Sequence, residues 1–339
     1  MSVKAIVNLK TVVSNAKRVK RLLPPEVKFC AVVKADAYGH GAQKVANALY
    51  KMADCFAVAT VEEGVALRLC GIDKDVLVLT RTLGGELARA VNYGLTLTAC
   101  ALSDLKRYAR EGGRQDERVK VHIKYDTGMR RQGISDFAEL KAALLYGVKN
   151  GRIDLCGLYS HFACPENENS HKRAMRKFSF AKSLAKKFDE NIVCHISASG
   201  GFIAGEFCDM VRIGILLYGY TPFKTDVIQV KPAMKVFAPV VAEKTLMRGD
   251  CALYGEKRAA KSVRITLVRY GYADGLPRKE TVGQFNNRCM DITALTGVKR
   301  GTKRVAVMDN AEEIAERYDT IPYEILVKCA LRADKIYIT

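Results

Sequence analysis

The chain has 339 residues, of which 49% are hydrophobic and 27% charged, as in a globular protein with one large domain and a smaller companion. Eleven cysteines without a CxxC pair, and five histidines without a close pair, argue against a disulfide framework and a metal site. No run of apolar residues approaches the roughly 18 that a membrane span needs, and the first ten residues lack the apolar centre of a signal peptide. We therefore predict a cytoplasmic protein that binds no membrane.

The charge balance is unusual, because 55 basic and 36 acidic residues give a net charge of +19. Such an excess can serve nucleic acid, an acidic surface or anionic substrates. The basic residues are scattered along the chain, and the densest run without acids, 172–187, has apolar residues at helical spacing. This run is typical of the solvated face of a helix, so we predict no nucleic-acid partner.

Short β-rich runs bounded by turns predict eight strands, at 29–33, 55–59, 75–79, 95–99, 119–124, 154–159, 192–196 and 210–216. Amphipathic segments lie between most of them, at 41–49, 62–69, 85–93, 103–110 and 136–148. Alternating strands and helices predict a parallel sheet, and eight such units fit a closed (β/α)₈ barrel. An open, doubly wound sheet is the structural alternative.

The pattern changes after Pro222, where helical periodicity fades. Short apolar runs alternate with turns at 238–241, 262–268, 290–293, 305–308 and 335–339, which predicts a mainly antiparallel β domain. The opening run 3–8 precedes the first barrel unit and could pair with this second domain. We therefore divide the chain into an N-terminal strand (1–10), a barrel (11–228) and a C-terminal β domain (229–339).

Reactive groups of a parallel barrel gather where its strands end, and several predicted strands end in polar residues. Lys34 follows the apolar first strand directly. A lysine there is costly unless it is paired, neutral or covalently used, because burial disfavours its charge; the alternative is a side chain that reaches solvent. Other strand ends carry Lys124, Arg131, His161, Ser199 and Arg212.

Small residues after the last two strands predict a phosphate site, since barrels commonly hold a phosphate at this place. Ser199, Gly200, Gly214 and Ile215 fit that site. A lysine and a phosphate cradle at one barrel mouth suggest pyridoxal phosphate, which needs a lysine, a phosphate site and a partner for its ring nitrogen.

The segment AVVKADAYGHGA at 31–42 closely resembles the cofactor-lysine signature of the alanine racemase family. Seven further segments resemble motifs of that family in the same order: KYDTGMRRQG (124–133), GLYSHFA (157–163), VRIGILLYG (211–219), LYG (253–255), GYADGLPR (271–278), CMD (289–291) and PYEIL (322–326). The resemblance spans nearly the whole chain and implies the barrel and β domain predicted above, with pyridoxal phosphate as cofactor.

The resemblance implies two catalytic bases. Lys34 resembles the lysine that holds the cofactor covalently and acts as one base, and Tyr254 resembles the base on the opposite face, contributed by the partner subunit's β domain. Racemisation removes a proton from one face of Cα and returns one to the other, so two bases must flank the substrate. The resemblance assigns the α-proton of L-alanine to Tyr254 and that of D-alanine to Lys34. A tyrosine has a reference pKa of about 10, so Tyr254 needs positive charge nearby, which we expect from His161 and Arg131.

The remaining site residues are assigned by the same resemblance. Arg212 would face the ring nitrogen of the cofactor, with His161 among the cofactor contacts. The expected phosphate ligands are Tyr38, Ser199, Gly214, Ile215 and Tyr323. Arg131 and Met290 would contact the substrate carboxylate, Tyr272 and Tyr323 would form a gate, and Lys124 matches a lysine that is carbamylated in some members.

We therefore predict a pyridoxal-phosphate-dependent racemase that interconverts L- and D-alanine for peptidoglycan precursors, as a homodimer with shared active sites. A racemase of broader specificity, for serine or basic amino acids, is the alternative enzyme. A non-catalytic pyridoxal-phosphate-binding homeostasis protein is the alternative from another class, although it leaves the second domain with Tyr254 unexplained.

Overall fold

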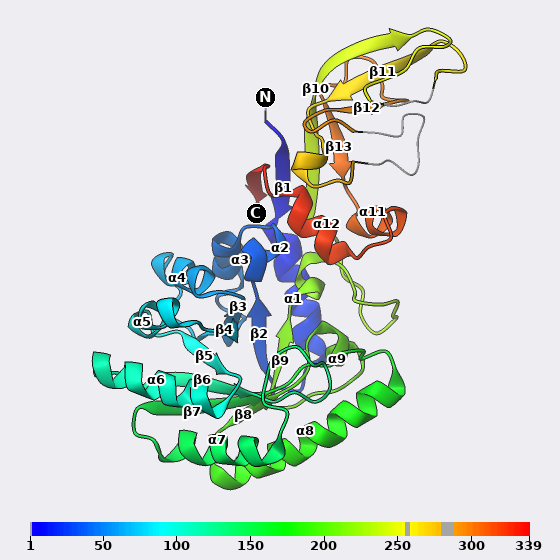
Figure 1. Ribbon diagram of the computed structural model, residues 1–339. Coiled ribbons are helices and arrows are strands. Elements are labelled where there is room, and N and C mark those ends of the chain that lie inside the picture. The colour runs from blue at the N-terminus through cyan, green and yellow to red at the C-terminus, as the bar shows by residue number, and fades with distance from the viewer. Residues whose placement is uncertain (1, 255–257, 279–287) are drawn as a thin grey trace.

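The computed structural model describes residues 2–254, 258–278 and 288–339. Its larger part is a sheet of eight parallel strands surrounded by helices (Figure 1). The strands are β2 (Lys28–Val32), β3 (Cys55–Val58), β4 (Val76–Arg81), β5 (Thr96–Ala99), β6 (Val119–Lys124), β7 (Ile153–Tyr159), β8 (Val193–His195) and β9 (Met210–Ile213). The prediction of eight strands is confirmed.

The sheet closes on itself. β9 pairs with β2, and backbone bonds also join it to the chain of β8: Asp209 N donates to Cys194 O at 3.0 Å, and Arg212 N donates to Ser197 O at 2.9 Å. The sheet is therefore a closed barrel, as predicted, and not the open, doubly wound alternative. The eighth strand is shorter than predicted, because the chain turns at Gly214 and begins the short helix α10 (Ile215–Tyr218).

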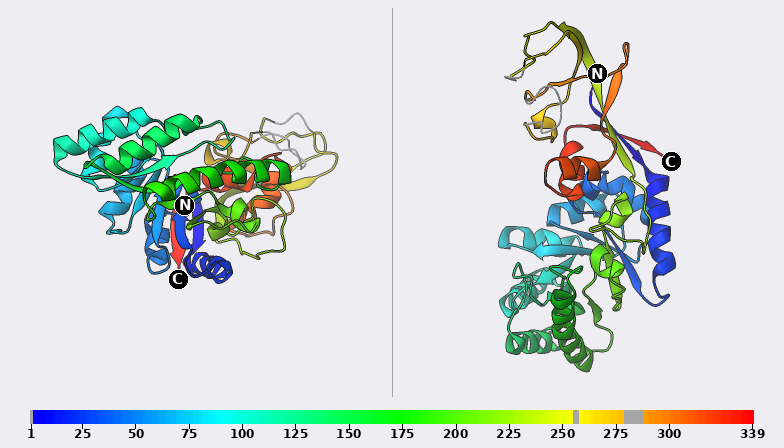
Figure 2. Two further views of the ribbon diagram at one scale, coloured as in Figure 1. Left: turned by 90° about the horizontal axis from the view of Figure 1, so that it is seen from below. Right: turned by 90° about the vertical axis from the view of Figure 1, so that its right-hand side faces the viewer.

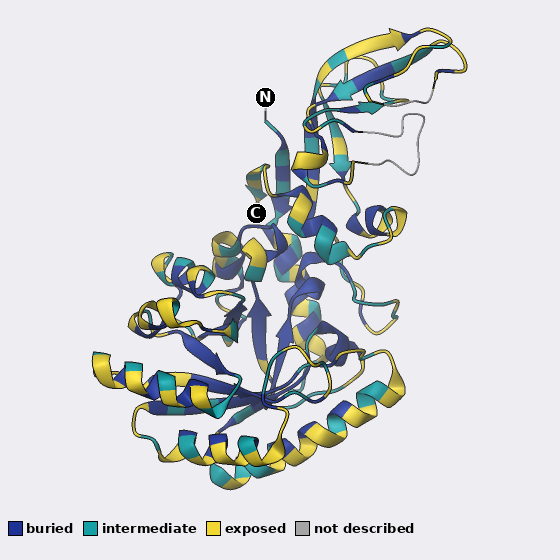
Figure 3. Cartoon of the chain, viewed as in Figure 1, coloured by how far each residue is buried: buried dark blue, intermediate teal, exposed yellow. Residues whose placement is uncertain are grey.

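Helices cover the outside of the barrel and bury one face each, as Figure 3 shows. They are α1 (Leu9–Leu22), α3 (Ala42–Leu49), α4 (Val61–Leu69), α5 (Gly84–Asn92), α6 (Leu102–Gln115), α7 (Phe137–Lys149) and α8 (Glu168–Phe188); α2 (Lys34–Tyr38) and α9 (Ser199–Ile203) are short turns at strand ends. In α8 the buried residues are Ala174, Phe178, Ala181 and Ala185, so its many basic residues lie on the outer face.

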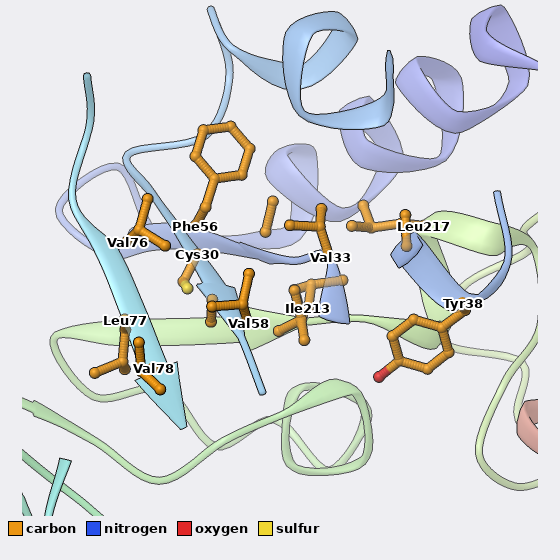
Figure 4. Packing of buried hydrophobic residues seen from close by; sticks show 14 of the residues in the cluster. Cys30, Val33, Tyr38, Phe56, Val58, Val76, Leu77, Val78, Ile213 and Leu217 are labelled. Atoms are coloured by element: carbon orange, nitrogen blue, oxygen red, sulfur yellow. The ribbon is translucent and has the colours of Figure 1, made fainter. Parts of the chain in front are cut away.

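The barrel core is made of branched and aromatic side chains from neighbouring strands. In Figure 4, Phe56 and Val58 of β3 lie between Val76–Val78 of β4 and Ile213 of β9. Phe56, Val58 and Ile213 are fully buried. Burying an aliphatic or aromatic side chain of this size contributes about 1.5–3 kcal/mol, so the strands are held where their ends can form one site.

The second part of the chain is a six-stranded sheet that extends away from the barrel (Figure 2). β10 (Met234–Leu246) pairs antiparallel with β11 (Val263–Val268), β13 (Arg304–Met308) and β1 (Lys4–Asn8). β12 (Thr293–Leu295) continues the sheet beyond β11, and β14 (Asp334–Ile338) pairs parallel with β1. The N-terminal strand thus lies within the sheet of the C-terminal region.

Two features of this region differ from the sequence prediction. The strand expected at 290–293 begins only at Thr293, because the carbonyls of Cys289 and Met290 accept bonds from Tyr272 and Ala273 of the 3₁₀ turn η1 (Tyr272–Asp274). Helices α11 (Ala311–Arg317) and α12 (Pro322–Cys329) were not predicted, since seven or eight residues carry too little periodicity. Within the described residues, no helix is long and apolar enough to cross a membrane.

Candidate active site

The chain turns in a left-handed helix directly after β2. Ala35, Asp36, Ala37 and Tyr38 have φ values of +50° to +54°, a region that costs an ordinary residue about 1–2 kcal/mol. Several bonds outside the turn hold it: Glu63 Oε1 accepts from Ala35 N at 2.6 Å, and Asp36 pairs with Lys335 of β14 at 2.8 Å. The turn carries the side chain of Lys34 and that of Tyr38 into the same cavity.

Ala35→Gly should raise the free energy of unfolding by about 0.5–1 kcal/mol, because glycine adopts positive φ without the steric cost of a Cβ. Urea unfolding of the full chain measures this change. Ala142→Gly is the matched control, since Ala142 is exposed within the right-handed helix α7 and its replacement should cost about 1 kcal/mol. Destabilisation of both variants to the same extent would contradict the account of backbone strain at Ala35.

A cavity of about 720 Å³ opens where the barrel strands end. It brings together ten of the residues assigned from the sequence: Lys34, Tyr38, Lys124, Arg131, His161, Ser199, Arg212, Gly214, Ile215 and Tyr323. Four of these are lysine or arginine, and the described lining contains no aspartate or glutamate. The cavity is therefore suited to a strongly anionic ligand.

Arg212 lies at the floor of the cavity and is buried. Its guanidinium donates to the carbonyls of Ser160 at 2.8 Å and Ile196 at 2.9 Å, and to the rings of His195 and His161. Its Cζ lies 5.2 Å from the centre of the Tyr159 ring. Because an arginine only donates hydrogen bonds, each histidine nitrogen that it contacts must be an unprotonated acceptor.

His161 is therefore neutral. Burial is the main cause that lowers its pKa well below the ordinary value, and the charge of Arg212 adds to the effect. This differs from our expectation that His161 supplies positive charge to the site. The charge comes instead from Arg212 and Arg131, which line the cavity.

Burial also favours the neutral form of the two lysines. It lowers the pKa of Lys34, with Arg131 as the next cause. Burial, followed again by Arg131, lowers the pKa of Lys124 to about 8. Lys124 is 5% exposed and its Nζ lies 5.5 Å from the centre of the Tyr159 ring. Both amines can thus act as bases or nucleophiles at a lower pH than an exposed lysine.

Hydroxyl groups and backbone atoms form another part of the cavity lining. Gly214 N donates to Ser199 Oγ at 3.4 Å, and the rings of Tyr38 and Tyr323 lie 5.9 Å apart. A Cβ on Gly214 would lie 2.6 Å from Tyr38 Oη, so the tyrosine occupies space that only a glycine leaves. Burial raises the pKa of Tyr38 and that of Tyr323, the latter to about 12. Both hydroxyls keep their protons and can donate to an anion.

Two family models match consecutive parts of the chain: the N-terminal domain of alanine racemase over residues 7–222 and its C-terminal domain over residues 233–337. The chain belongs to the alanine racemase family. This confirms the family assignment made from the motifs, together with a barrel followed by a β domain and an amino-acid racemase as the class of enzyme. The same matches do not favour the alternative of a non-catalytic cofactor-binding protein.

Relatives in this family are similar over nearly their whole length. Alanine racemase 2 of Caldanaerobacter subterraneus is 33% identical over 98% of this chain and 94% of its own, and alanine racemase of Streptococcus pyogenes is 32% identical over 98% and 97%. The structure of alanine racemase from Clostridium difficile has a TM-score of 0.91 at 28% identity and covers 100% of this chain and 96% of its own. That of Bacillus anthracis alanine racemase with bound L-Ala-P has a TM-score of 0.91 at 27% identity, with 100% and 95% covered.

Three residues that the resemblance assigns to the alanine racemase site do not line the described cavity: Tyr254, Tyr272 and Met290. All three lie in the C-terminal region and are exposed, Tyr254 by 70%, Met290 by 55% and Tyr272 by 38%. Of the motif at 253–255, residue 255 lies outside the described residues. Within a single chain, the described lining of the cavity therefore lacks the residue that the resemblance assigns as the second base.

The sequence analysis missed several residues that shape the site. Glu63 fixes the left-handed turn, and Tyr159 stacks on the ring of His195, 5.0 Å away and 3° from parallel. His122 lies behind His195 and bonds to it. The available signal for His122 was a polar residue between the apolar residues Val121 and Ile123 of a strand. Nothing in the sequence marks Glu63 as a partner of residue 35.

Proposed function

We propose that this protein is a pyridoxal-phosphate-dependent racemase that interconverts L- and D-alanine. The proposal rests on the cavity in which a lysine at a strand end, a buried arginine and several hydroxyl groups meet. Its described lining contains two arginines, two lysines and no carboxylate. Both the phosphate of the cofactor and the carboxylate of an amino acid need such surroundings.

The residues present fit the cofactor. Tyr38, Ser199, Gly214, Ile215 and Tyr323 would hold its phosphate, since these residues line the cavity with two tyrosine hydroxyls, a serine hydroxyl and backbone N–H groups. Arg212, with His161 beside it, would face the ring nitrogen, and Lys34 Nζ would hold the cofactor covalently. When bound, pyridoxal phosphate supplies an electron sink that makes the α-proton of an amino acid acidic.

The side chains of this protein would then move the proton. Lys34 serves as one base, and its lowered pKa favours the neutral amine, which can accept a proton. Arg131, at the rim, would bind the substrate carboxylate. Arg212 keeps all its protons, so it leaves the ring nitrogen unprotonated and limits the electron withdrawal, which disfavours side reactions such as transamination.

The second base would come from another copy of the chain. Tyr254, Met290 and Tyr272 are exposed in the region that extends from the barrel, which supports a homodimer in which the partner's region closes the cavity. There Tyr254 would face Lys34 across the substrate, Met290 would contact the carboxylate, and Tyr272 would form the entrance gate with Tyr323. Supply of D-alanine to peptidoglycan precursors and a cytoplasmic location are parts of the same proposal.

Racemisation of a panel of pure L-amino acids by the purified protein tests this function. We expect L-alanine to be converted at the highest kcat/KM, with exchange of its α-proton for deuterium from the solvent. A preference for serine or for basic amino acids would favour the broader racemase. Binding of the cofactor without turnover of any amino acid would contradict the proposal.

Lys124 is proposed to carry a carbamate. Its pKa of about 8 leaves a fraction of the amine neutral near pH 7, and only the neutral amine attacks CO₂. The carbamate would replace a like-charge contact with Arg131 by an anion that supports it. We expect a carbamate signal in ¹³C NMR of protein equilibrated with ¹³CO₂, absent in Lys124→Ala, and a severalfold higher KM in that variant. Exposed Lys44 provides the control, Lys44→Ala, which should keep the signal.

A further inference from the structure

A chain of hydrogen bonds continues from Arg212 into the barrel, away from the cavity. Arg212 Nη1 donates to His195 Nδ1. The other nitrogen of that ring, Nε2, lies 2.9 Å from His122 Nδ1. His195 is fully buried and His122 is 8% exposed. His122 is not among the residues that line the cavity, so its place in the reaction needs a separate argument.

The direction of each bond follows from the arginine. Since a guanidinium can only donate, His195 Nδ1 must be unprotonated, and a neutral His195 then carries its proton on Nε2. That N–H donates to His122 Nδ1, which must in turn be an acceptor. Burial is the main cause that lowers the pKa of both rings, that of His122 to about 4, and the charge of Arg212 acts in the same direction on each. Asp75 raises the pKa of His122 and Lys28 lowers it, with the net effect downward.

The pairing of strands β6, β7 and β8 brings the His122 and His195 rings together. His122 on β6 has Gly157 on β7 as its strand partner, and Tyr159 on β7 is paired with His195 on β8. A Cβ on Gly157 would lie 2.4 Å from His122 Nδ1, so the His122 ring occupies the space over this glycine. Tyr159 stacks on His195 and is itself held by bonds to Leu79 O and Thr98 Oγ1. His195 thus has one face against Tyr159 and both nitrogens engaged.

We propose that His122 is a positioning residue for racemisation: by accepting from His195 Nε2, it fixes the tautomer in which His195 Nδ1 receives Arg212 and so holds the guanidinium at the ring nitrogen of the cofactor. This rests on the proposed function, because Arg212 matters to the reaction only if the cofactor lies against it. Without the acceptor, His195 can carry its proton on Nδ1, where it no longer accepts from Arg212.

Two substitutions separate this role from simple packing. In His122→Asn, the amide oxygen can take the place of Nδ1 and accept from His195. In His122→Leu, a side chain of similar reach fills the space but has no acceptor. We expect His122→Asn to keep kcat within about twofold and His122→Leu to lose about tenfold, the size of one buried hydrogen bond, with little change in KM.

The tautomer is measured directly by ¹⁵N solid-state NMR of histidine-labelled holoenzyme, in which five histidines give few signals. The wild type and His122→Asn should show His195 protonated at Nε2 alone, and His122→Leu should show a population protonated at Nδ1. A pure Nε2–H signal and unchanged kcat in His122→Leu would overturn the proposal. If that variant does not fold, Gly157→Ala, which displaces the His122 ring, replaces it with the same expected results. A wild type that shows this tautomer but racemises no amino acid would refute the proposed function and not the hydrogen-bonded chain.

Discussion

Replacing Lys34 with alanine should lower racemase activity by about 10³-fold or more, because the variant loses both the covalent hold on the cofactor and one of the two bases. In the wild type, borohydride reduction followed by peptide mapping should place the cofactor on Lys34. Lys34 is the only lysine at the end of β2, and it lines the cavity together with the proposed phosphate ligands Tyr38 and Ser199.

Lys124 is the lysine against which the labelling of Lys34 is best compared, since it lines the same cavity and its pKa is also lowered. If burial alone made a lysine reactive toward the cofactor, reduction would label both residues. Our proposal requires the label on Lys34 and its loss in Lys34→Ala, whereas Lys44→Ala should retain label and activity. A label on Lys124, or on any surface lysine in place of Lys34, would show that the assignment is wrong.

The barrel could be predicted from the sequence because its strands are short β-rich runs bounded by turns, with amphipathic segments between most of them. Parallel strands place those ends at one edge, so Lys34, Lys124, His161 and Arg212 were expected to meet although they are far apart in the chain. The cavity brings them together. Helices α11 and α12 were not predicted because they are too short for their periodicity to stand out.

Other features of the site depend on contacts that no local pattern reveals. Ala35, Asp36 and Ala37 adopt positive φ although none is a glycine, and they do so because Glu63 and Lys335 bond to the turn from distant parts of the chain. The neutral state of His161 depends on its burial and on Arg212, whose guanidinium donates to the His161 ring. Nor does one chain show the partner subunit whose Tyr254 we propose as the second base.

A site shared between subunits predicts complementation. Mixing Lys34→Ala with Tyr254→Phe allows heterodimers in which one site has both bases and the other has neither. After random exchange of subunits, half of the dimers are mixed and half of their sites are intact, so about a quarter of the wild-type activity should return. No recovery despite proven subunit exchange would mean that the site is built within one chain. Mixing either variant with itself is the control.

Tyr254→Phe should also separate the two directions of the reaction. If Lys34 and Tyr254 stand on opposite faces of the substrate, each removes the α-proton of only one enantiomer. The family resemblance gives L-alanine to Tyr254 and D-alanine to Lys34. The variant should therefore lose about 10²–10⁴-fold in proton removal from L-alanine, and it should keep part of that from D-alanine, because Lys34 and its surroundings are unchanged.

Net racemisation by Tyr254→Phe should nevertheless fall in both directions, since a proton returned to the far face must also come from Tyr254. The half-reactions are distinguished by the loss of isotope from each α-deuterated enantiomer in a single turnover, with bound cofactor followed by its absorbance. Exposed Tyr272, which is assigned to the gate and not to proton transfer, provides the matched control. Tyr272→Phe should change both half-reactions to the same extent. Equal loss of both half-reactions in Tyr254→Phe, with the cofactor still bound, would contradict the assignment of one base to each face.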